Sequence, residues 1–343
     1  MTYLMPEHMD EIVTTAQAIV ADNKGLLAAD ESAPTIAKRF NSIMVDSTEE
    51  NRRFYRETLF STPGAEEYIS GVILFEETLG QSNSDGAPFP VYLAAKGIIP
   101  GIKVDLGLRH ILGCPGESFT LGLDSLEERC IEYRDMGARF AKWRSVFHIM
   151  PQGPSHTAVE INTHALGQYA SICQHTGLVP IVEPEILITG NHDIETAKRV
   201  SLWVLGRVFD QLLRHQVVLE GIILKPSMVT PGDGHPDQPC PETVARATVE
   251  TFKRVVPAAV PGITFLSGGQ TPLQATANLN AMNQLVHLPW KLSFSFGRAL
   301  QEDALKTWAG NPNNKSLIQD VFYHRAKCNG AACEGMYRES MDA

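Results

Sequence analysis

Short apolar runs, rich in β-branched and aromatic residues, recur along the chain and are separated by stretches of mixed polarity. The runs begin near residues 25, 69, 99, 138, 178, 221, 262 and 291. Between most of them apolar and polar residues alternate with helical period, as at 47–60, 125–137, 156–176, 194–215 and 243–256. Strands that alternate with helices in this way predict βα units and a parallel sheet.

The number of strands decides between architectures. Eight strands, with no glycine-rich dinucleotide-binding turn after the first, favour a closed (β/α)8 barrel over an open sheet. An extra helix near 6–22 and a C-terminal tail from about residue 310 are predicted to pack outside the barrel. Because no linker or change of composition divides the chain, we expect residues 1–343 to form one α/β domain.

Two predicted helices carry signals for their ends. Ser47 and Glu50 have the spacing of a capping box, which predicts a helix start there. The helix at 125–137 begins with Ser125, a good N-cap residue, and ends at Gly137, which suits the position after a helix.

Composition and charge exclude several classes of protein. Residues are 43% hydrophobic and 20% charged, which is a globular composition rather than a disordered, collagenous or coiled-coil one. The formal net charge is 29 − 39 = −10, which argues against nonspecific nucleic-acid binding. With no apolar run of about 18 residues and no secretory leader, we expect no membrane partner. Six cysteines without Cys-x-x-Cys spacing indicate reduced thiols, so we expect a cytoplasmic protein.

Charged residues stand at the carboxyl ends of six predicted strands. They are Asp30, Lys103 with Asp105, Lys142 with Arg144, Glu183 with Glu185, Lys225, and Arg298. Three of these sets are i, i+2 pairs, whose side chains share one face of a strand. Charges in a buried parallel sheet are costly unless they surround a polar cavity. We therefore expect them to converge at the barrel's active-site mouth, the alternative being separate salt bridges at loop entrances.

Lys225 is the strongest candidate for a nucleophile. It closes the run GIILKP, which holds no acidic residue, and the neighbouring strands would bring Lys142 near it. An uncharged lysine amine attacks a ketone to form a Schiff base, an electron sink that permits carbon–carbon cleavage. Glu183, Glu185 and Asp30 would supply the carboxyl groups that move protons in such a reaction.

Two groups of residues suit bound phosphate. Ser267, Gly268 and Gly269 offer unobstructed backbone N–H groups, and Gly297 and Arg298 at the end of the last strand add a guanidinium. Across the mouth a second set would hold another phosphate: Thr35, Lys38, Arg39 and Lys103. Two phosphate sites on opposite sides of the reacting groups favour a bisphosphorylated sugar as the substrate.

Two other chemistries are disfavoured. The pentapeptide LSGGQ at 266–270 equals the signature of ABC-transporter ATPases, but the chain has no Gly-Lys dipeptide and hence no Walker A loop. No two of the eleven histidines have helical metal-ligand spacing, and none ends a strand. We therefore expect neither a catalytic metal nor another cofactor.

Taken together, these residues resemble class I fructose-bisphosphate aldolase from about residue 9 to 337. The motifs that carry the resemblance, in chain order, are LLAADES (26–32), TIAKRF (35–40), VPIVEPEIL (179–187), LEGIILKPSMVTPG (219–232), GITFLSGGQ (262–270) and FSFGRAL (294–300). The resemblance implies a (β/α)8 barrel that cleaves fructose 1,6-bisphosphate reversibly to dihydroxyacetone phosphate and glyceraldehyde 3-phosphate, in glycolysis and gluconeogenesis. It also implies a homotetramer without a metal.

The resemblance further implies roles for individual residues. Lys225 forms the Schiff base, Glu183 is the acid and base of its formation, and Asp30 takes the proton of the hydroxyl beside the broken bond. Glu185 and Lys142 assist. The ketone-side phosphate is bound by Ser267, Gly268, Gly269, Ser295, Gly297 and Arg298. The other end of the substrate is surrounded by Lys103, Arg144, Thr35, Lys38 and Arg39. Two alternatives stay open: a Schiff-base aldolase that prefers sedoheptulose 1,7-bisphosphate or fructose 1-phosphate, and a non-catalytic barrel scaffold.

Overall fold

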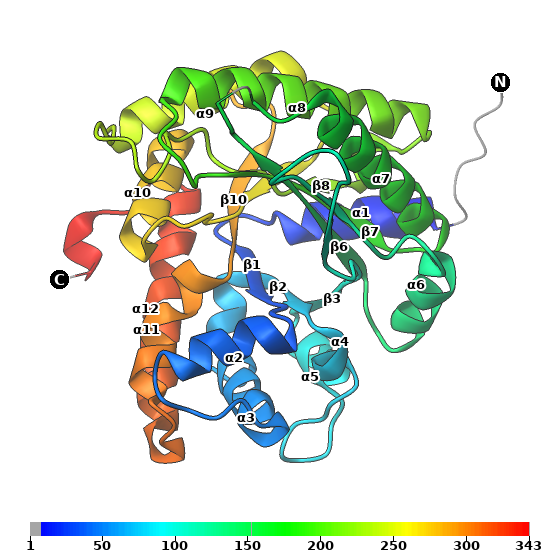
Figure 1. The fold of residues 1–343 in the computed structure, drawn as a ribbon. Coiled ribbons are helices and arrows are strands. Elements are labelled where there is room, and N and C mark those ends of the chain that lie inside the picture. Colours follow the sequence, from blue (N-terminus) through cyan, green and yellow to red (C-terminus); the bar gives the residue numbers. More distant parts are fainter. Residues whose placement is uncertain (1–7, 152, 343) are drawn as a thin grey trace.

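Eight parallel strands close into a barrel in a computed structural model that describes residues 8–151 and 153–342 (Figure 1). Each predicted run forms one strand: β1 (Gly25–Ala29), β2 (Ile69–Leu74), β3 (Ile99–Lys103), β6 (Phe140–His148), β7 (Val179–Leu187), β8 (Ile223–Leu224), β9 (Gly262–Phe265) and β10 (Lys291–Phe296). Neighbours follow the chain order, and β1 pairs with β10 to close the ring. The predicted (β/α)8 architecture is confirmed.

Helices surround the barrel on the outside (Figure 1). They are α2 (Ala33–Asn41), α3 (Glu49–Phe60), α4 (Glu76–Leu79), α5 (Phe89–Ala95), α6 (Leu126–Asp135), α7 (His156–His175), α8 (Ile194–Arg214), α9 (Pro241–Val255), α10 (Pro272–Asn283), α11 (Arg298–Trp308) and α12 (Lys315–Cys333). Short 3-10 turns accompany them: η1 (Ala65–Glu67), η2 (Leu219–Gly221), η3 (Pro312–Asn314) and η4 (Glu339–Asp342). Each described helix is too short or too polar to traverse a lipid bilayer.

Helix starts follow side-chain capping at several places, though not always at the predicted residue. Thr48, not Ser47, caps α3 and accepts a hydrogen bond from the Asn51 backbone N–H at 3.1 Å, so the predicted box of Ser47 and Glu50 is wrong by one residue. Ser125 precedes α6 in the left-handed region at φ +53° and makes no capping bond. Gly137, at φ +110°, follows α6 as predicted, because that conformation suits glycine.

A short hairpin between β3 and α6 is absent from the prediction. Its strands are β4 (Leu108–His110) and β5 (Ser118–Thr120), which pair antiparallel. Three residues are too few to show the alternation by which a strand is recognised. The hairpin lies beyond the carboxyl end of β3, and Leu108 lines the cavity at that end of the barrel.

The opposite end of the barrel is closed by the additional helix α1 (Met9–Ile19). Its Ile12 and Ile19 belong to an apolar cluster with interior residues of the strands, among them Ile181 and Ile223. A Cβ built on Gly101 would lie 2.1 Å from the Phe140 ring, so glycine is required for this packing. Apolar side chains therefore fill the end of the barrel that α1 closes, and polar side chains are left for the carboxyl ends of the strands.

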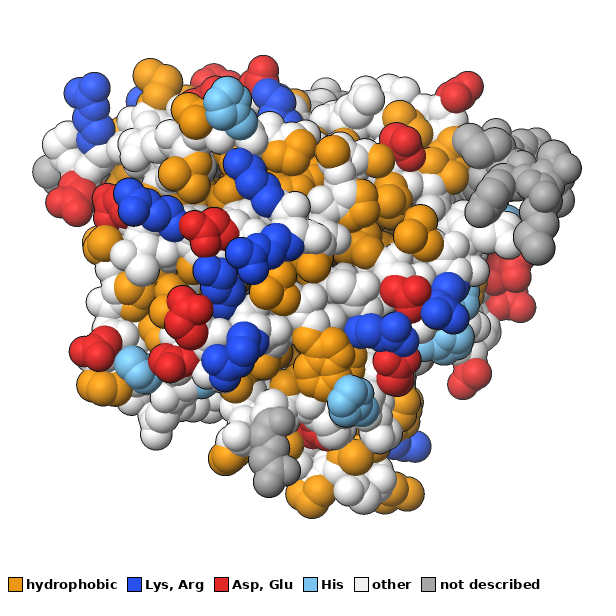
Figure 2. All heavy atoms as spheres, turned by 90° about the horizontal axis from the view of Figure 1, so that it is seen from above, with side chains coloured by type: hydrophobic (Ala, Val, Ile, Leu, Met, Phe, Trp, Pro, Cys, Tyr) orange, Lys and Arg blue, Asp and Glu red, His pale blue; other side chains and the backbone are white. Residues whose placement is uncertain are grey.

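The outer helices present a solvated face. Figure 2 shows acidic, basic and hydrophobic side chains interspersed on the side covered by α8 and α9. Ion pairs join charges there, such as Lys198 with Glu250 at 3.0 Å and Arg207 with Glu160 at 2.7 Å. Such exposed pairs contribute little to stability.

Candidate active site

A cavity of about 860 Å³ opens at the carboxyl ends of the strands. The sixteen residues with a predicted catalytic or substrate-binding role all line it: Asp30, Thr35, Lys38, Arg39, Lys103, Lys142, Arg144, Glu183, Glu185, Lys225, Ser267, Gly268, Gly269, Ser295, Gly297 and Arg298. Asp105 lines it as well. The expectation that charged strand ends converge is therefore confirmed for this structure. Separate salt bridges at loop entrances would not share one cavity.

Strand register explains why the charges meet. On β6 and β7, Arg144 lies opposite Glu183, and Lys142 lies two residues before Arg144 on the same face. Lys103 on β3 pairs in register with Lys142. The Lys225 backbone N–H donates to the Val182 carbonyl at 2.8 Å, which continues β8 beyond its two residues.

Four side chains form a chain of ion pairs at the cavity floor. Lys142 Nζ lies 2.6 Å from Asp30 Oδ2 and 3.2 Å from Glu183 Oε2. The other oxygen of Glu183, Oε1, lies 3.1 Å from Lys225 Nζ. Lys142, Glu183 and Lys225 are 3, 4 and 4% exposed. One buried carboxylate thus bridges two buried amines.

The charges in this chain stabilise one another. Burial opposes ionisation of Lys142, but Asp30, Glu183 and Asp105 outweigh it and raise the pKa of Lys142 above its ordinary value. Burial likewise opposes ionisation of Asp30, but the ammonium groups of Lys142 and Lys225 hold the pKa of Asp30 well below its usual range. The Asp30–Lys142 pair is therefore ionised near neutral pH.

A second pair of interactions surrounds the first. Arg144 forms an ion pair with Glu185, and Lys103 Nζ lies 2.8 Å from Asp105 Oδ1. Burial opposes the charge on Arg144, but Glu185 and Glu183 raise the pKa of Arg144 above its ordinary value. Four carboxylates and four cations therefore balance at the centre: Asp30, Asp105, Glu183 and Glu185 against Lys103, Lys142, Arg144 and Lys225.

The loop after β9 has the backbone of an anion-binding site. Gly268 and Gly269 lie in the left-handed region at φ +45° and +86°, where glycine is strongly favoured. A Cβ on Gly269 would lie 3.9 Å from the Arg298 guanidinium, which places that side chain beside the loop. The buried Ser295 hydroxyl has no hydrogen-bond partner within the described part of the chain. Successive free N–H groups, a hydroxyl and a guanidinium together suit a phosphate.

The opposite wall contains a carboxylate that the sequence argument overlooked. Thr35, Lys38 and Arg39 lie on α2, and Arg39 forms an ion pair with the buried Glu31. Glu31 also accepts a hydrogen bond from the Gln301 amide and lies 3.7 Å from the buried Arg56 guanidinium. Its position directly after Asp30 is the signal in the sequence, but adjacent residues of a strand point to opposite faces, so strand alternation alone does not place Glu31 in the cavity with Asp30.

Comparison with known proteins agrees with this geometry. The family model for fructose-bisphosphate aldolase class-I matches residues 11–343. A probable fructose-bisphosphate aldolase class 1 from Xylella fastidiosa is 54% identical over 96% of this chain and 99% of its own length. Cytosolic fructose-bisphosphate aldolase 6 of Arabidopsis thaliana is 53% identical, over 96% of this chain and 92% of its own.

A solved structure shares the whole fold. The fructose-bisphosphate aldolase of Plasmodium falciparum, in a ternary complex with TRAP and a small-molecule inhibitor, superimposes with a TM-score of 0.95 at 48% identity. The match covers 96% of this chain and 95% of that one. The family resemblance noted in the sequence is thus confirmed, and the chain belongs to the class I fructose-bisphosphate aldolase family.

Proposed function

We propose that this chain reversibly cleaves fructose 1,6-bisphosphate to dihydroxyacetone phosphate and glyceraldehyde 3-phosphate, in glycolysis and gluconeogenesis, through a Schiff base on Lys225. The observation that carries the proposal is the buried Glu183 carboxylate, which lies 3.1 Å from Lys225 Nζ and 3.2 Å from Lys142 Nζ. This arrangement gives an amine a proton acceptor within hydrogen-bond reach, as nucleophilic catalysis requires.

The reaction then follows from the order of these groups. Proton transfer from Lys225 to Glu183 leaves a neutral amine, which attacks the substrate ketone. In the adduct one proton moves from the nitrogen to the oxygen, and Glu183 returns its proton to the resulting carbinolamine hydroxyl, which departs as water and leaves an iminium ion. Asp30 takes the proton of the hydroxyl beside the reacting bond, and the bond's electrons move to the iminium nitrogen. The aldehyde leaves, the resulting enamine gains a proton on carbon, and water hydrolyses the Schiff base to release the ketone.

Lys142 and Glu185 support this sequence. The Lys142 ammonium, 2.6 Å from Asp30, stabilises negative charge on Asp30 and Glu183 as protons move. Glu185 holds Arg144 at the cavity wall. Substrate position is assigned to two phosphate sites, with Ser267, Gly268, Gly269, Ser295, Gly297 and Arg298 on the ketone side. Thr35, Lys38, Arg39, Lys103 and Arg144 take the other end.

The location, oligomeric state and domain organisation of the enzyme are proposed from its relatives and from its packing. A cytoplasmic location rests on the relative from Arabidopsis thaliana, whose name includes cytosolic. The homotetramer rests on family membership. One domain is proposed because the C-terminal α12 shares a core with the barrel helices, through residues such as Ile318 and Phe322.

Trapping of the Schiff base tests the proposal. Borohydride added with dihydroxyacetone phosphate should inactivate the enzyme and add the mass of the reduced adduct to the peptide that holds Lys225. Lys225→Met should abolish both labelling and cleavage, whereas Lys198→Met, at an exposed ion pair, should leave both intact. Labelling of another lysine, or cleavage by the Lys225→Met variant, would overturn the assignment.

Ratios of kcat/KM for fructose 1,6-bisphosphate, fructose 1-phosphate and sedoheptulose 1,7-bisphosphate establish the preferred sugar.

A further inference from the structure

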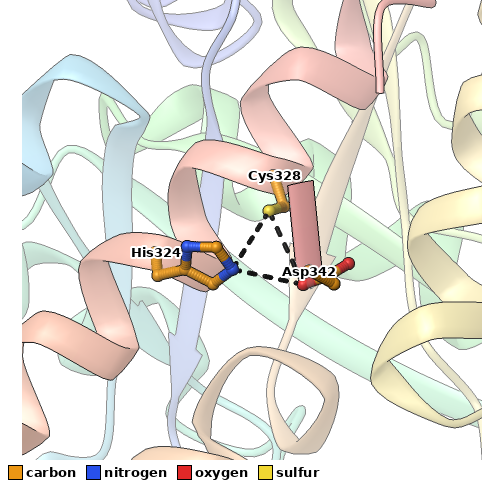
Figure 3. Close-up of side chains that lie close together, drawn as sticks. All are labelled: His324, Cys328 and Asp342. Atoms are coloured by element: carbon orange, nitrogen blue, oxygen red, sulfur yellow. Dashed lines mark hydrogen bonds and ion pairs between the residues drawn. The ribbon is translucent and has the colours of Figure 1, made fainter. Parts of the chain in front are cut away.

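Three side chains with metal-binding atoms meet at the C-terminal end of the chain, outside the catalytic cavity. His324 and Cys328 lie one turn apart on α12, and Asp342 comes from the short turn η4. Figure 3 shows the imidazole, the thiol and the carboxylate pointing toward one another. Cys328 is buried, and the Asp342 side chain is 11% exposed, whereas His324 borders solvent.

The spacing of the three atoms matches a tetrahedral zinc ion. Bonds of about 2.0–2.1 Å to nitrogen and oxygen and about 2.3 Å to sulfur put two tetrahedral vertices roughly 3.3 to 3.6 Å apart. Here His324 Nε2 lies 3.3 Å from Asp342 Oδ1, and Cys328 Sγ lies 3.7 Å from each of them. The ligand atoms therefore need only small movements to reach a common ion.

The surroundings of Asp342 resemble an outer shell of hydrogen bonds. The Tyr337 hydroxyl donates to Oδ2 at 2.6 Å, and Arg325 donates to Oδ2 at 3.2 Å and forms an ion pair with Oδ1 at 2.6 Å. Partners of this kind fix the orientation of a ligating carboxylate. The guanidinium bond to Oδ1 competes with an ion, so binding requires Arg325 to keep only its contact with Oδ2.

We propose that His324, Cys328 and Asp342 bind one zinc ion, with a solvent molecule as the fourth ligand on the exposed side of His324. The mixture of nitrogen, sulfur and oxygen donors suits zinc better than magnesium or calcium, which take oxygen ligands. On binding, the Cys328 thiol releases its proton to solvent and the sulfur bonds to the ion.

The ion would fasten the end of the chain to α12. That end is one wall of a second cavity of about 850 Å³, which Tyr337, Glu339 and Asp342 help to line. Gly269 borders both this cavity and the catalytic one. Zinc would therefore fix a surface one loop away from the proposed phosphate site.

Zinc titration of the metal-free full chain tests the site without reference to catalysis. A competing chromophoric chelator should report one ion per chain. Because loss of an outer-shell partner alone weakens metal binding about 10–100-fold, Cys328→Ser and the half-exposed His324→Ala should each weaken it by more than about 100-fold. Cys333→Ser is the matched control, because that thiol lies on the same helix but faces Ser293.

Two further readouts complete the test. Cobalt substitution should give a thiolate-to-metal absorption band that Cys328→Ser removes and Cys333→Ser retains. Zinc should also slow amide hydrogen exchange in residues 334–342 of the wild-type chain, but not of Cys328→Ser. Failure of the wild-type chain to bind zinc, or zinc binding that Cys328→Ser and His324→Ala both retain, would overturn the proposal.

Discussion

Replacing Lys142 by methionine tests the electrostatic account of the cavity floor. The substitution keeps the length of the side chain but removes the only cation that forms an ion pair with Asp30 among the described residues. Glu183 and Asp105 keep Lys225 and Lys103 as partners, at 3.1 and 2.8 Å. The variant therefore leaves one carboxylate, Asp30, unpaired.

The size of the effect follows from burial. Removing one member of a buried pair costs about 3–5 kcal/mol, and an exposed pair is worth about 0–1 kcal/mol. The Asp30 side chain is 12% exposed and opens onto the cavity, so we expect a loss of about 2–4 kcal/mol near pH 7. With an unfolding entropy of about 2.1 cal/mol/K per residue over 343 residues, Tm should fall by about 3–6 °C.

The pH dependence distinguishes this cause from lost packing. In the wild type the lowered pKa of Asp30 makes the pair stabilising above the ordinary aspartate value of about 3.9, and the contribution disappears as pH falls through the folded-state value. Without Lys142, we expect burial to raise the pKa of Asp30, so that the folded variant takes up a proton on mild acidification. The Tm difference should therefore narrow between pH 7 and 5.

Differential scanning fluorimetry across this range measures the effect. Lys198→Met serves as the control, because its partner Glu250 is 58% exposed and about 1 °C or less is expected. A loss of Tm in Lys142→Met no larger than in the control, or a Tm difference that widens in acid, would contradict an electrostatic origin of the effect.

Further predictions concern the cavity wall, the barrel interior and metal dependence. Glu31→Gln should raise KM for the bisphosphate about tenfold or more, because Arg39 loses its charged partner; an unchanged KM in steady-state assays would contradict this. Gly101→Ala should lower stability by about 1–3 kcal/mol or more through overpacking against Phe140. Gly206→Ala in α8, where an added Cβ would lie 3.9 Å from Val255, should be neutral or stabilising in denaturant titrations. EDTA should leave cleavage intact, and an activity loss reversed by zinc would refute a metal-free reaction.

The barrel could be predicted from the sequence because its strands are strongly marked. Runs such as 178–182 are apolar on both faces, as buried parallel strands require, and a charged residue, Glu183, follows this run. Shared edges of parallel strands then bring Glu183 and Lys225 together without knowledge of side-chain positions. The convergence of the charged ends rests on topology alone, which is why it could be predicted.

Other features depend on information that no local pattern contains. The position of Glu31 in the cavity wall depends on how α2 packs against the barrel. Whether Ser47 or Thr48 caps α3 depends on the residue at which the backbone turns into the helix, and both residue types are good N-caps. The cluster of His324, Cys328 and Asp342 mixes residue types and joins positions up to eighteen apart, so a search for paired histidines overlooks it.

Because the charges at the centre of the cavity balance, attraction of the substrate and the chemical reaction depend on different residues. Four acids cancel four bases, Lys225 among them, so the reacting groups attract a distant anion only weakly. Within the described chain, Lys38 and Arg298 have no carboxylate partner, and they border the rim. Electrolyte should therefore slow the arrival of a doubly phosphorylated sugar while leaving the turnover of the captured molecule almost unchanged.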